Sequence, residues 1–477
     1  MKPILFAAAC ALTFAAADAG QARTPSVSAR DRAAAAQQHP QVVAQFGGEV
    51  TGPASTYVKA VGEKMASTAG LPGQCTFTLI GSEVVNAFAV PGCYIYVTRG
   101  LLAIMNSEDE LASVLGHEVG HITGNHSGQR QTRGALAGLG ALAVGVITGS
   151  GQLAQVASQL GGLYTLSYSR AQEFDADDRG VSFLLGSGYN SFAAADMLQT
   201  LGSNDALTRR VGQRTGSEIP AWASSHPLTG DRVTRAAAKA QASGGVRETP
   251  AQKSRVYLQA VNGLIYGDDP EQGFVNGNTF AHPKLKIAFD VPQGFTLTNT
   301  ATSVNVAGPN GLKAMFSAGA LSSGGLDAYA TGVLAKVVGQ APTQVAAFQH
   351  GTTNGLQTTL LPARAQTSSG QQVDVAVTAY QVGNSAYHFV TLAPAGAAGP
   401  FTPMLGSFRQ LSDQQAAALR ARRIEVVTVG AGDTVQSLAQ RMAFTDYQVD
   451  RFLSLNGRTA TQPLRAGELV KLITYAR

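Results

Sequence analysis

The chain has 477 residues, of which 44% are hydrophobic and only 14% charged, and it contains 54 glycines. This composition is that of a folded protein of several domains and excludes an intrinsically disordered chain. The net charge of +5 arises without a dense run of lysine or arginine, so binding to nucleic acid is not indicated.

The first 22 residues, "MKPILFAAACALTFAAADAGQA", combine an early Lys2 with a nearly continuous apolar stretch and a small-residue site at 17–19. This pattern predicts a secretory signal peptide over 1–22 and a periplasmic location after its removal. Only nine residues precede Cys10, which favours ordinary cleavage over attachment of a lipid to that cysteine.

Loss of the signal peptide would leave two cysteines, Cys75 in "CTFTLI" and Cys93 in "PGCYIYV". Both lie in a region with strand character, and an oxidising periplasm permits a disulfide. We expect neighbouring antiparallel strands to hold their Cα atoms about 5.5 Å apart, which suits a disulfide. The alternative is a pair of small buried thiols.

The segment "LASVLGHEVGHITGNH" follows Ser107 and three acidic residues, which together are a helix start signal. In such a helix His117 and His121 lie one turn apart on the same face, where both imidazoles can bind one zinc ion. Glu118 projects beside the metal, where a carboxylate can accept a proton from a zinc-activated water. The alternative is two histidines that share a helix face without a metal.

A catalytic zinc needs a third protein ligand, and the candidate helix lies over 168–189. Glu173 and Asp177 are one turn apart on it, so Glu173 can bind the metal while Asp177 orients a zinc histidine. Acidic residues also favour the first turn of any helix, so the spacing alone leaves the role of Glu173 open.

Between these motifs, the Gly-rich segment 134–151 is the closest approach to a membrane span, but it has fewer than the roughly 18 to 20 apolar residues that a span needs. We expect a buried or mobile helix pair there, and peripheral contact with a membrane stays open.

Three stretches, "SEDELASVLGHEVGHITGNH", "YSRAQEFDADDRG" and "SSHPLTGDRV", together resemble the HtpX-type zinc metallopeptidases, a family that also includes the CAAX prenyl proteases and the periplasmic protease BepA. The resemblance covers about residues 30–240. It implies one zinc ion per chain, with His117, His121 and Glu173 as ligands and Glu118 as the catalytic base.

The stretch "NAFAVPGCYIYVTRGLL" matches the strand pair before the zinc helix of that family. The resemblance places Asn86, Ala87 and Phe88 on a strand that edges the cleft, where an extended substrate can pair with the backbone. The family usually has a glycine where this chain has Cys93.

In the family, the loop that here contains His226 returns to the active site. There His226 can donate a hydrogen bond to the oxyanion of the tetrahedral intermediate, or it can bind zinc as a fourth ligand and hold the enzyme latent. Arg232 is expected to steady the same loop. His126 is interpreted as a helix-terminal or surface residue, and the remaining histidines as isolated.

After the peptidase region, which is predicted over 23–245, we expect a linker over 246–275 and a small α+β domain of unknown role over 276–412. The segment 424–475 looks like a LysM-like βααβ module, because Gly432, Asp433, Thr434 and Asn456 fit its pattern. That resemblance implies binding to peptidoglycan, and a generic module without sugar affinity is the alternative.

The predicted fold class is therefore α+β: a mainly helical gluzincin-type peptidase domain with a small β-sheet, then the α+β domain and the LysM-like module. The predicted function is an exported zinc endopeptidase that cleaves polypeptides of the cell envelope in protein quality control. One alternative is a latent, peptidoglycan-anchored, chaperone-like binding protein with His226 on the zinc. A peptidoglycan hydrolase is a second alternative, and the oligomeric state stays open.

Overall fold

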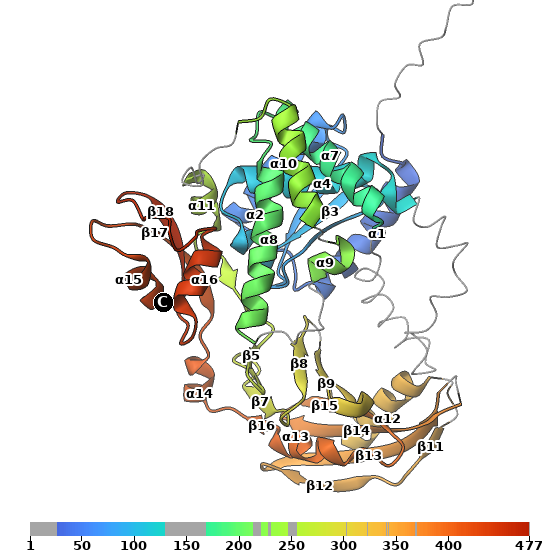
Figure 1. Ribbon diagram of the computed structural model, residues 1–477. Coiled ribbons are helices and arrows are strands. Elements are labelled where there is room, and N and C mark those ends of the chain that lie inside the picture. Colours follow the sequence, from blue (N-terminus) through green and yellow to red (C-terminus); the bar gives the residue numbers. More distant parts are fainter. Residues whose placement is uncertain are drawn as a thin grey trace, which may run out of the picture.

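The computed structural model describes residues 26–128, 168–212, 221–227, 230–246 and 255–476, apart from positions 302, 322, 340, 342, 368 and 369. The predicted signal peptide and the Gly-rich segment 134–151 lie outside these residues. Figure 1 shows a helical part above, a large β-sheet below it, and a C-terminal module beside α8 and α11. No helix within the described ranges is long and apolar enough to cross a membrane.

The helical part contains a small sheet of three strands in the order β1-β3-β2, with β1 and β3 parallel and β2 antiparallel at the edge. Helix α1 packs on one face of this sheet through Val42 and Phe46, which contact Phe88 and Tyr96. Helices α2 and α4 pack on the other side, in the largest apolar core. The elements are α1 (Ala29–Gln45), α2 (Pro53–Thr68), β1 (Thr76–Ile80), β2 (Ala87–Val90), β3 (Tyr94–Thr98), α3 (Arg99–Ile104), α4 (Glu108–Thr123), α7 (Arg170–Gly186), α8 (Ala193–Arg210), α9 (Ala221–Ser225) and α10 (Gly230–Ala242).

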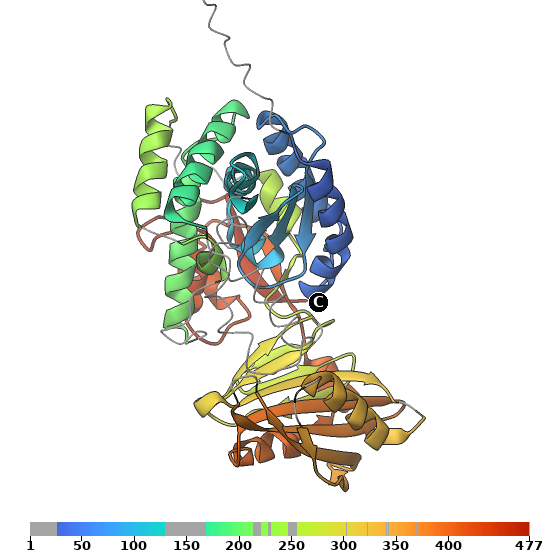
Figure 2. The ribbon, with the colours of Figure 1, turned by 90° about the vertical axis from the view of Figure 1, so that its right-hand side faces the viewer.

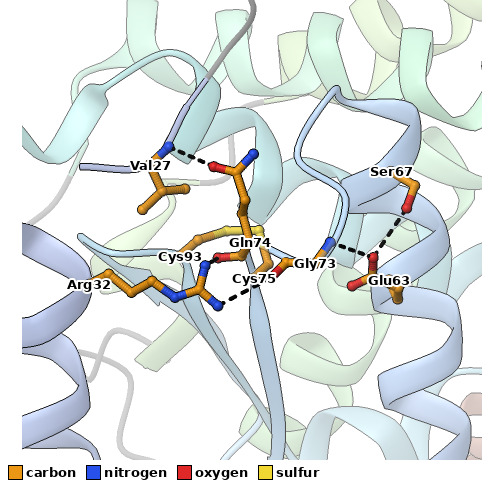
Figure 3. Close-up of a disulfide and its surroundings, with 8 residues drawn as sticks. All are labelled: Val27, Arg32, Glu63, Ser67, Gly73, Gln74, Cys75 and Cys93. Atoms are coloured by element: carbon orange, nitrogen blue, oxygen red, sulfur yellow. Dashed lines mark hydrogen bonds between the residues drawn. A yellow bond between two sulfur atoms is a disulfide. The ribbon is translucent and has the colours of Figure 1, made fainter. Parts of the chain in front are cut away.

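A disulfide joins Cys75 and Cys93, whose Cα atoms lie 4.6 Å apart (Figure 3). The two cysteines directly precede β1 and β3. These two strands are parallel, whereas the sequence analysis expected antiparallel strands. The backbone of Cys93 has φ +58°, in the left-handed region that favours glycine. A glycine, which the resemblance implies for this position in the family, would adopt this conformation without strain.

Residues 255–266, which the sequence placed in a linker, form α11 (Arg255–Val261) and the short strand β4 (Ile265–Tyr266). Tyr257 and Leu258 are fully buried, and the hydroxyl of Tyr257 donates to the carbonyl of Leu102. The apolar side chains of α11 therefore fix this segment in the peptidase core, a packing that its sequence alone did not indicate.

The lower part is built on an eight-stranded sheet in the order β11-β13-β14-β15-β10-β9-β8, with β12 paired to β13. Helix α12 packs on β13, β14 and β15. The lower part also contains a four-stranded sheet in the order β16-β7-β6-β5. Its elements are β5 (Phe274–Asn276), β6 (Thr279–His282), β7 (Ile287–Asp290), β8 (Thr296–Asn299), β9 (Val304–Ala307), η2 (Pro309–Gly311), β10 (Lys313–Ala320), α12 (Gly325–Val338), β11 (Thr343–Val345), β12 (Gln349–Thr353), β13 (Leu356–Gln366), β14 (Gln372–Val382), β15 (Ser385–Pro394), η3 (Gly399–Phe401), α13 (Thr402–Ser407) and β16 (Arg409–Gln410).

After the short helix α14 (Asp413–Ala418), the C-terminal module follows the order β17 (Arg422–Thr428), α15 (Val435–Gln440), α16 (Gln448–Leu455) and β18 (Leu469–Tyr475). The two strands pair antiparallel, and β4 adds a third strand beside β17. Figure 2 shows this module (red) behind the helices of the peptidase part.

The C-terminal module shares the largest apolar core with the peptidase part. The ammonium group of Lys471 is fully buried and donates to the carbonyls of Ala103 and Met105, at the end of α3. Cations are favourable at the C-terminal end of a helix, where carbonyl groups lack partners within the helix. The contact therefore joins β18 firmly to the peptidase part.

Candidate metal centre

Helix α4 carries the H-E-x-x-H group, and its start is fixed locally. The hydroxyl of Ser107 accepts from the backbone N–H of Glu110, which satisfies one of the free N–H groups of the first turn. Leu111, Leu115 and Val119 are fully buried on its apolar face. This packing leaves the histidines on the face toward α7.

Small residues allow α4 and α7 to pack closely. A Cβ atom added to Gly120 would lie 2.9 Å from the carbonyl oxygen of Ala176, and one added to Gly180 would lie 3.2 Å from the backbone nitrogen of His117. A side chain at Gly120 would require the backbone of α7 to shift, and one at Gly180 would require its neighbour to move by a few tenths of an ångström. The close approach brings the acidic residues of α7 within reach of the two histidines of α4.

Four side chains from these helices and from the end of α9 form a cluster that can hold a metal ion. One donor atom from each of His117, His121, Glu173 and His226 lies within 4.8 Å of the others. The Nε2 atoms of His117 and His121 are 3.0 Å apart, and Oε1 of Glu173 lies 3.5 Å from Nε2 of His121. Ligands about 2.0 Å from a tetrahedral zinc are separated by roughly 3.3 Å, so this donor set fits zinc in chemistry and spacing.

Asp177 lies on the far side of His117, where its Oδ1 is 2.9 Å from Nδ1 of the imidazole. Arg232 donates to both oxygens of Asp177 at 2.8 Å and to the carbonyl of Pro227. Arg232 also forms an ion pair with Glu173. One guanidinium therefore holds the orienting carboxylate, a candidate ligand and the loop that follows His226.

His126 is buried, so its interpretation as a surface residue was wrong. Its Nδ1 lies 2.9 Å from Nδ1 of His121, and its Nε2 lies 3.1 Å from Oδ2 of Asp175. Arg179 donates to the same carboxylate at 2.7 Å. The turn after α4 folds His126 back beneath the zinc helix, a tertiary placement that helical periodicity could not indicate.

Burial and nearby charges together set the protonation states of the site residues. Burial lowers the pKa of His121 well below its ordinary value, and the neighbouring histidines lower it further, so the imidazole is kept neutral. Burial alone would raise the pKa of Glu173, but His226, His117 and Arg232 outweigh it and lower the pKa. The same balance lowers the pKa of Asp177, through hydrogen bonds with Arg232 and His117. A neutral His121 and ionised Glu173 are the forms that bind zinc. His226 differs, because burial lowers the pKa of its imidazole but Glu173 and Glu118 outweigh burial and raise the pKa.

Glu118 is buried beside the cluster, and its Oε2 has no hydrogen-bond partner within the described part of the chain. Asn86 and Ala87 line the same cavity as His117 and Glu118. Phe88 does not line this cavity and packs beneath α1. Side chains alternate along a strand, so β2 directs Ala87 toward the metal cluster and Phe88 toward the other face.

Comparison with known proteins agrees with this geometry. Residues 54–240 match the family model of Peptidase family M48. The chain is 30% identical over 188 residues to a protein of Vibrio cholerae named putative beta-barrel assembly-enhancing protease, covering 37% of each chain. It is 29% identical over 186 residues to the mitochondrial metalloendopeptidase OMA1 of Schizosaccharomyces pombe, covering 38% of this chain and 52% of that one. It is 32% identical over 154 residues to the metalloprotease YcaL of Escherichia coli, covering 31% of this chain and 56% of that one.

The fold and the site, with the H-E-x-x-H group at 117–121, define the class of zinc metalloproteases. The residues that match Peptidase family M48, 54–240, include all four residues of the cluster. The matches to the three relatives cover less than two thirds of each relative's length.

Proposed function

We propose that the protein is a zinc-dependent endopeptidase that hydrolyses peptide bonds in polypeptides of the cell envelope. The observation that carries this proposal is the buried carboxylate of Glu118 beside three zinc-type donors, His117, His121 and Glu173. When bound there, zinc lowers the pKa of water and polarises a carbonyl group. Glu118 accepts the proton of the attacking water and returns it to the leaving amine as the peptide bond breaks.

Asp177 and His126 orient the two histidine ligands through their Nδ1 atoms, and Arg232 fixes Asp177. Asn86 supports the binding of a polypeptide, because its Oδ1 is buried at the cavity without a hydrogen-bond partner among the described residues. The carbonyl oxygen of such an amide can accept a hydrogen bond from a backbone N–H of the substrate. Strand β2 is an edge strand, which supports pairing with an extended chain.

His226 has two possible roles. Its Nδ1 lies 3.0 Å from Oε1 of Glu173 and 3.3 Å from Nε2 of His117, so it can complete a closed set of four ligands. Its Nε2 lies 3.5 Å from Glu118, on the side of the reacting groups, where it can donate to an oxyanion. The first role keeps the enzyme latent and underlies the alternative of a binding protein, whereas the second assists the reaction.

The compartment and the substrates belong to the proposal as well. The signal peptide predicted over 1–22 and the disulfide both support an oxidising, periplasmic location. The relatives named for beta-barrel assembly support quality control of envelope proteins. The βααβ order of the C-terminal module supports the LysM-like resemblance, and with it an affinity for peptidoglycan.

The test is to measure zinc content and casein cleavage for protein lacking residues 1–22, in the wild type, Glu118→Gln and His226→Ala. We expect one zinc per chain throughout and a loss of cleavage of about a hundredfold or more in Glu118→Gln. Higher activity in His226→Ala assigns a latch, and lower activity an oxyanion donor. Zinc binding without cleavage in any variant would favour the binding protein, and absence of zinc would overturn the proposal.

A further inference from the structure

Tyr168, which lies two residues before the start of α7, covers one face of the His121 imidazole. The centroids of the two rings are 3.7 Å apart and their planes differ by 19°, so the rings are stacked face to face. Tyr168 is buried, with only 5% of its surface exposed. A candidate zinc ligand is therefore packed against a flat aromatic ring that is itself shielded from solvent.

The ring of Tyr168 is held in place through both its hydroxyl and its backbone. The hydroxyl oxygen lies 3.1 Å from Oγ of Ser127, in the turn after α4. The backbone N–H donates at 3.1 Å to the carbonyl of Ser225, which directly precedes His226 in the chain. These contacts join three segments that are distant in sequence, and they keep the phenol ring on the face of His121.

The stack restrains a motion of His121 that its hydrogen bond leaves open. Nδ1 of His121 bonds to Nδ1 of His126, and an imidazole nitrogen makes such a bond in the plane of its ring. This bond sets the direction of the ring edge, but the ring can still tilt about the line of the bond. A flat ring in van der Waals contact with its face opposes that tilt. The two contacts together fix the direction in which Nε2 of His121 faces the metal cluster.

The stack also suits the charge that His121 acquires when it binds a metal ion. Coordination to a divalent cation withdraws electrons from an imidazole, so its ring becomes more positive. The face of a tyrosine ring is negative and attracts a positive group that is stacked on it. The attraction is therefore stronger in the metal-bound state than in the metal-free state, and this difference contributes to metal affinity.

We propose that Tyr168 is a positioning residue, which holds His121 for zinc binding through the negative face of its ring and not through its hydroxyl. The proposal rests on the zinc site of the proposed function and adds a residue that supports one of its ligands. Tyr168 does not line the cavity that contains His117 and Glu118, so contact with the substrate is not part of its role.

The first experiment measures the zinc affinity of wild type and variants by competition with a chelator. Tyr168→Leu removes the flat ring and should lower the affinity about tenfold or more, as is typical when the support of a metal ligand is lost. Tyr168→Phe keeps the ring and should bind zinc as tightly as the wild type. The matched control is Tyr329→Leu, because Tyr329 also contacts a histidine, His388, but in the lower part.

The second experiment records the visible spectrum of the same proteins after saturation with cobalt. The orientation of a ligand changes the energies of the d–d bands, whereas a general loss of stability leaves the spectrum of the folded protein unchanged. We expect the bands to shift in Tyr168→Leu and to stay in place in Tyr168→Phe and Tyr329→Leu. An unshifted spectrum in Tyr168→Leu would contradict a positioning role.

A further substitution tests the proposal even if Tyr168→Leu fails to fold. Pentafluorophenylalanine at position 168 keeps the shape of the phenylalanine ring but reverses the polarity of its face. Its zinc affinity should be lower than that of Tyr168→Phe, because the face then repels the more positive imidazole. Equal affinity in these two proteins would overturn the proposal.

The outcomes separate this proposal from the proposed function. Equal zinc affinity in Tyr168→Leu and wild type, or an equal loss in Tyr168→Leu and Tyr168→Phe, overturns the role of the ring and leaves the peptidase intact. The expected order of zinc affinities, found in a wild type that does not cleave casein, supports the role of the ring and overturns the peptidase.

Discussion

The Nδ1 atom of His121 lies 2.9 Å from the Nδ1 atom of His126. Because Nε2 of His121 faces the metal cluster, its Nδ1 carries the proton and donates to His126. The proton of His126 is then on Nε2, which donates to Asp175. Asp175 is held in turn by Arg179.

The two histidines of the H-E-x-x-H group are thus held in comparable ways. His117 contacts Asp177 directly, and Arg232 binds that carboxylate. His121 reaches its carboxylate, Asp175, through one intervening imidazole. Both aspartates lie on α7, the helix that also provides Glu173.

We expect His126→Ala to lower zinc affinity about ten- to hundredfold, because His121 loses the acceptor that fixes its orientation. His126→Asn should lose less, since its shorter amide can still accept from His121. The measurement is competition for zinc with a chelator, together with the visible spectrum of the cobalt-substituted protein. His388→Asn is the control, because His388 is also buried but lies on β15 of the large sheet, where it bonds to Tyr329 of α12. Equal zinc affinity in His126→Ala and wild type would contradict this role.

The disulfide stabilises the folded state, whereas the positive φ of Cys93 destabilises it. Removal of the disulfide in Cys75→Ser/Cys93→Ser should cost about 3 kcal/mol, given the 18-residue separation of the cysteines. Cys75→Ser/Cys93→Gly should recover about 1 kcal/mol of this loss, because glycine adopts the positive φ at position 93 without strain. Urea unfolding of the three proteins measures both differences. Equal stability of the two double variants would show that the backbone at position 93 relaxes once the disulfide is gone.

Lys471 is expected to stabilise a part of the chain far from it in sequence. Lys471→Met leaves the carbonyls of Ala103 and Met105 without this donor, which should cost about 2–3 kcal/mol. Trp222 lies in the peptidase part, so its emission during urea unfolding reports that part. We expect its midpoint to fall in Lys471→Met and to stay unchanged in Lys313→Met, which alters an exposed lysine. A C-terminal module that unfolded separately would leave the Trp222 transition where it is.

Much of the candidate site could be predicted from the sequence because it depends on local spacing. The helical positions of His117, Glu118 and His121 follow from their separation of one turn, and α4 places them as expected. The role of Glu173 needed the family resemblance, because acidic residues are common in any first helical turn.

The contacts that could not be predicted all join segments distant in sequence. His126 precedes Asp175 by 49 residues, and its burial depends on the packing of α4 against α7. Tyr257 and Lys471 lie in segments that resemble a linker and an independent module, and only the tertiary fold shows that both enter the peptidase core. Apolar periodicity predicts that a face is buried but does not indicate which element covers it.

Asp268 lies between β4 and β5, where the peptidase part continues into the lower part. We expect the free energy of unfolding to depend on its protonation state. Burial, followed by repulsion from Glu83, raises the pKa of Asp268 to about 7, although Arg422 and Arg99 oppose the shift. Because the folded state binds this proton more tightly than the unfolded state, the contribution to stability is present at low pH and is lost as pH rises through about 7. Asp268→Asn should therefore raise the free energy of unfolding more at about pH 8 than at about pH 5. A gain of the same size at both pH values would exclude this ionisation as the cause.

The hydrogen bonds of Lys471 to Ala103 and Met105 close loops of 368 and 366 residues. Contacts of such long separation form slowly, since the entropy of a large loop is lost before they are made. A chain emerging from the ribosome has completed the stretch with the zinc ligands long before β18 exists. The growing polypeptide therefore contains the whole metal cluster before the core that supports it is finished. We expect the peptidase part to reach its full stability only after β18 has been synthesised.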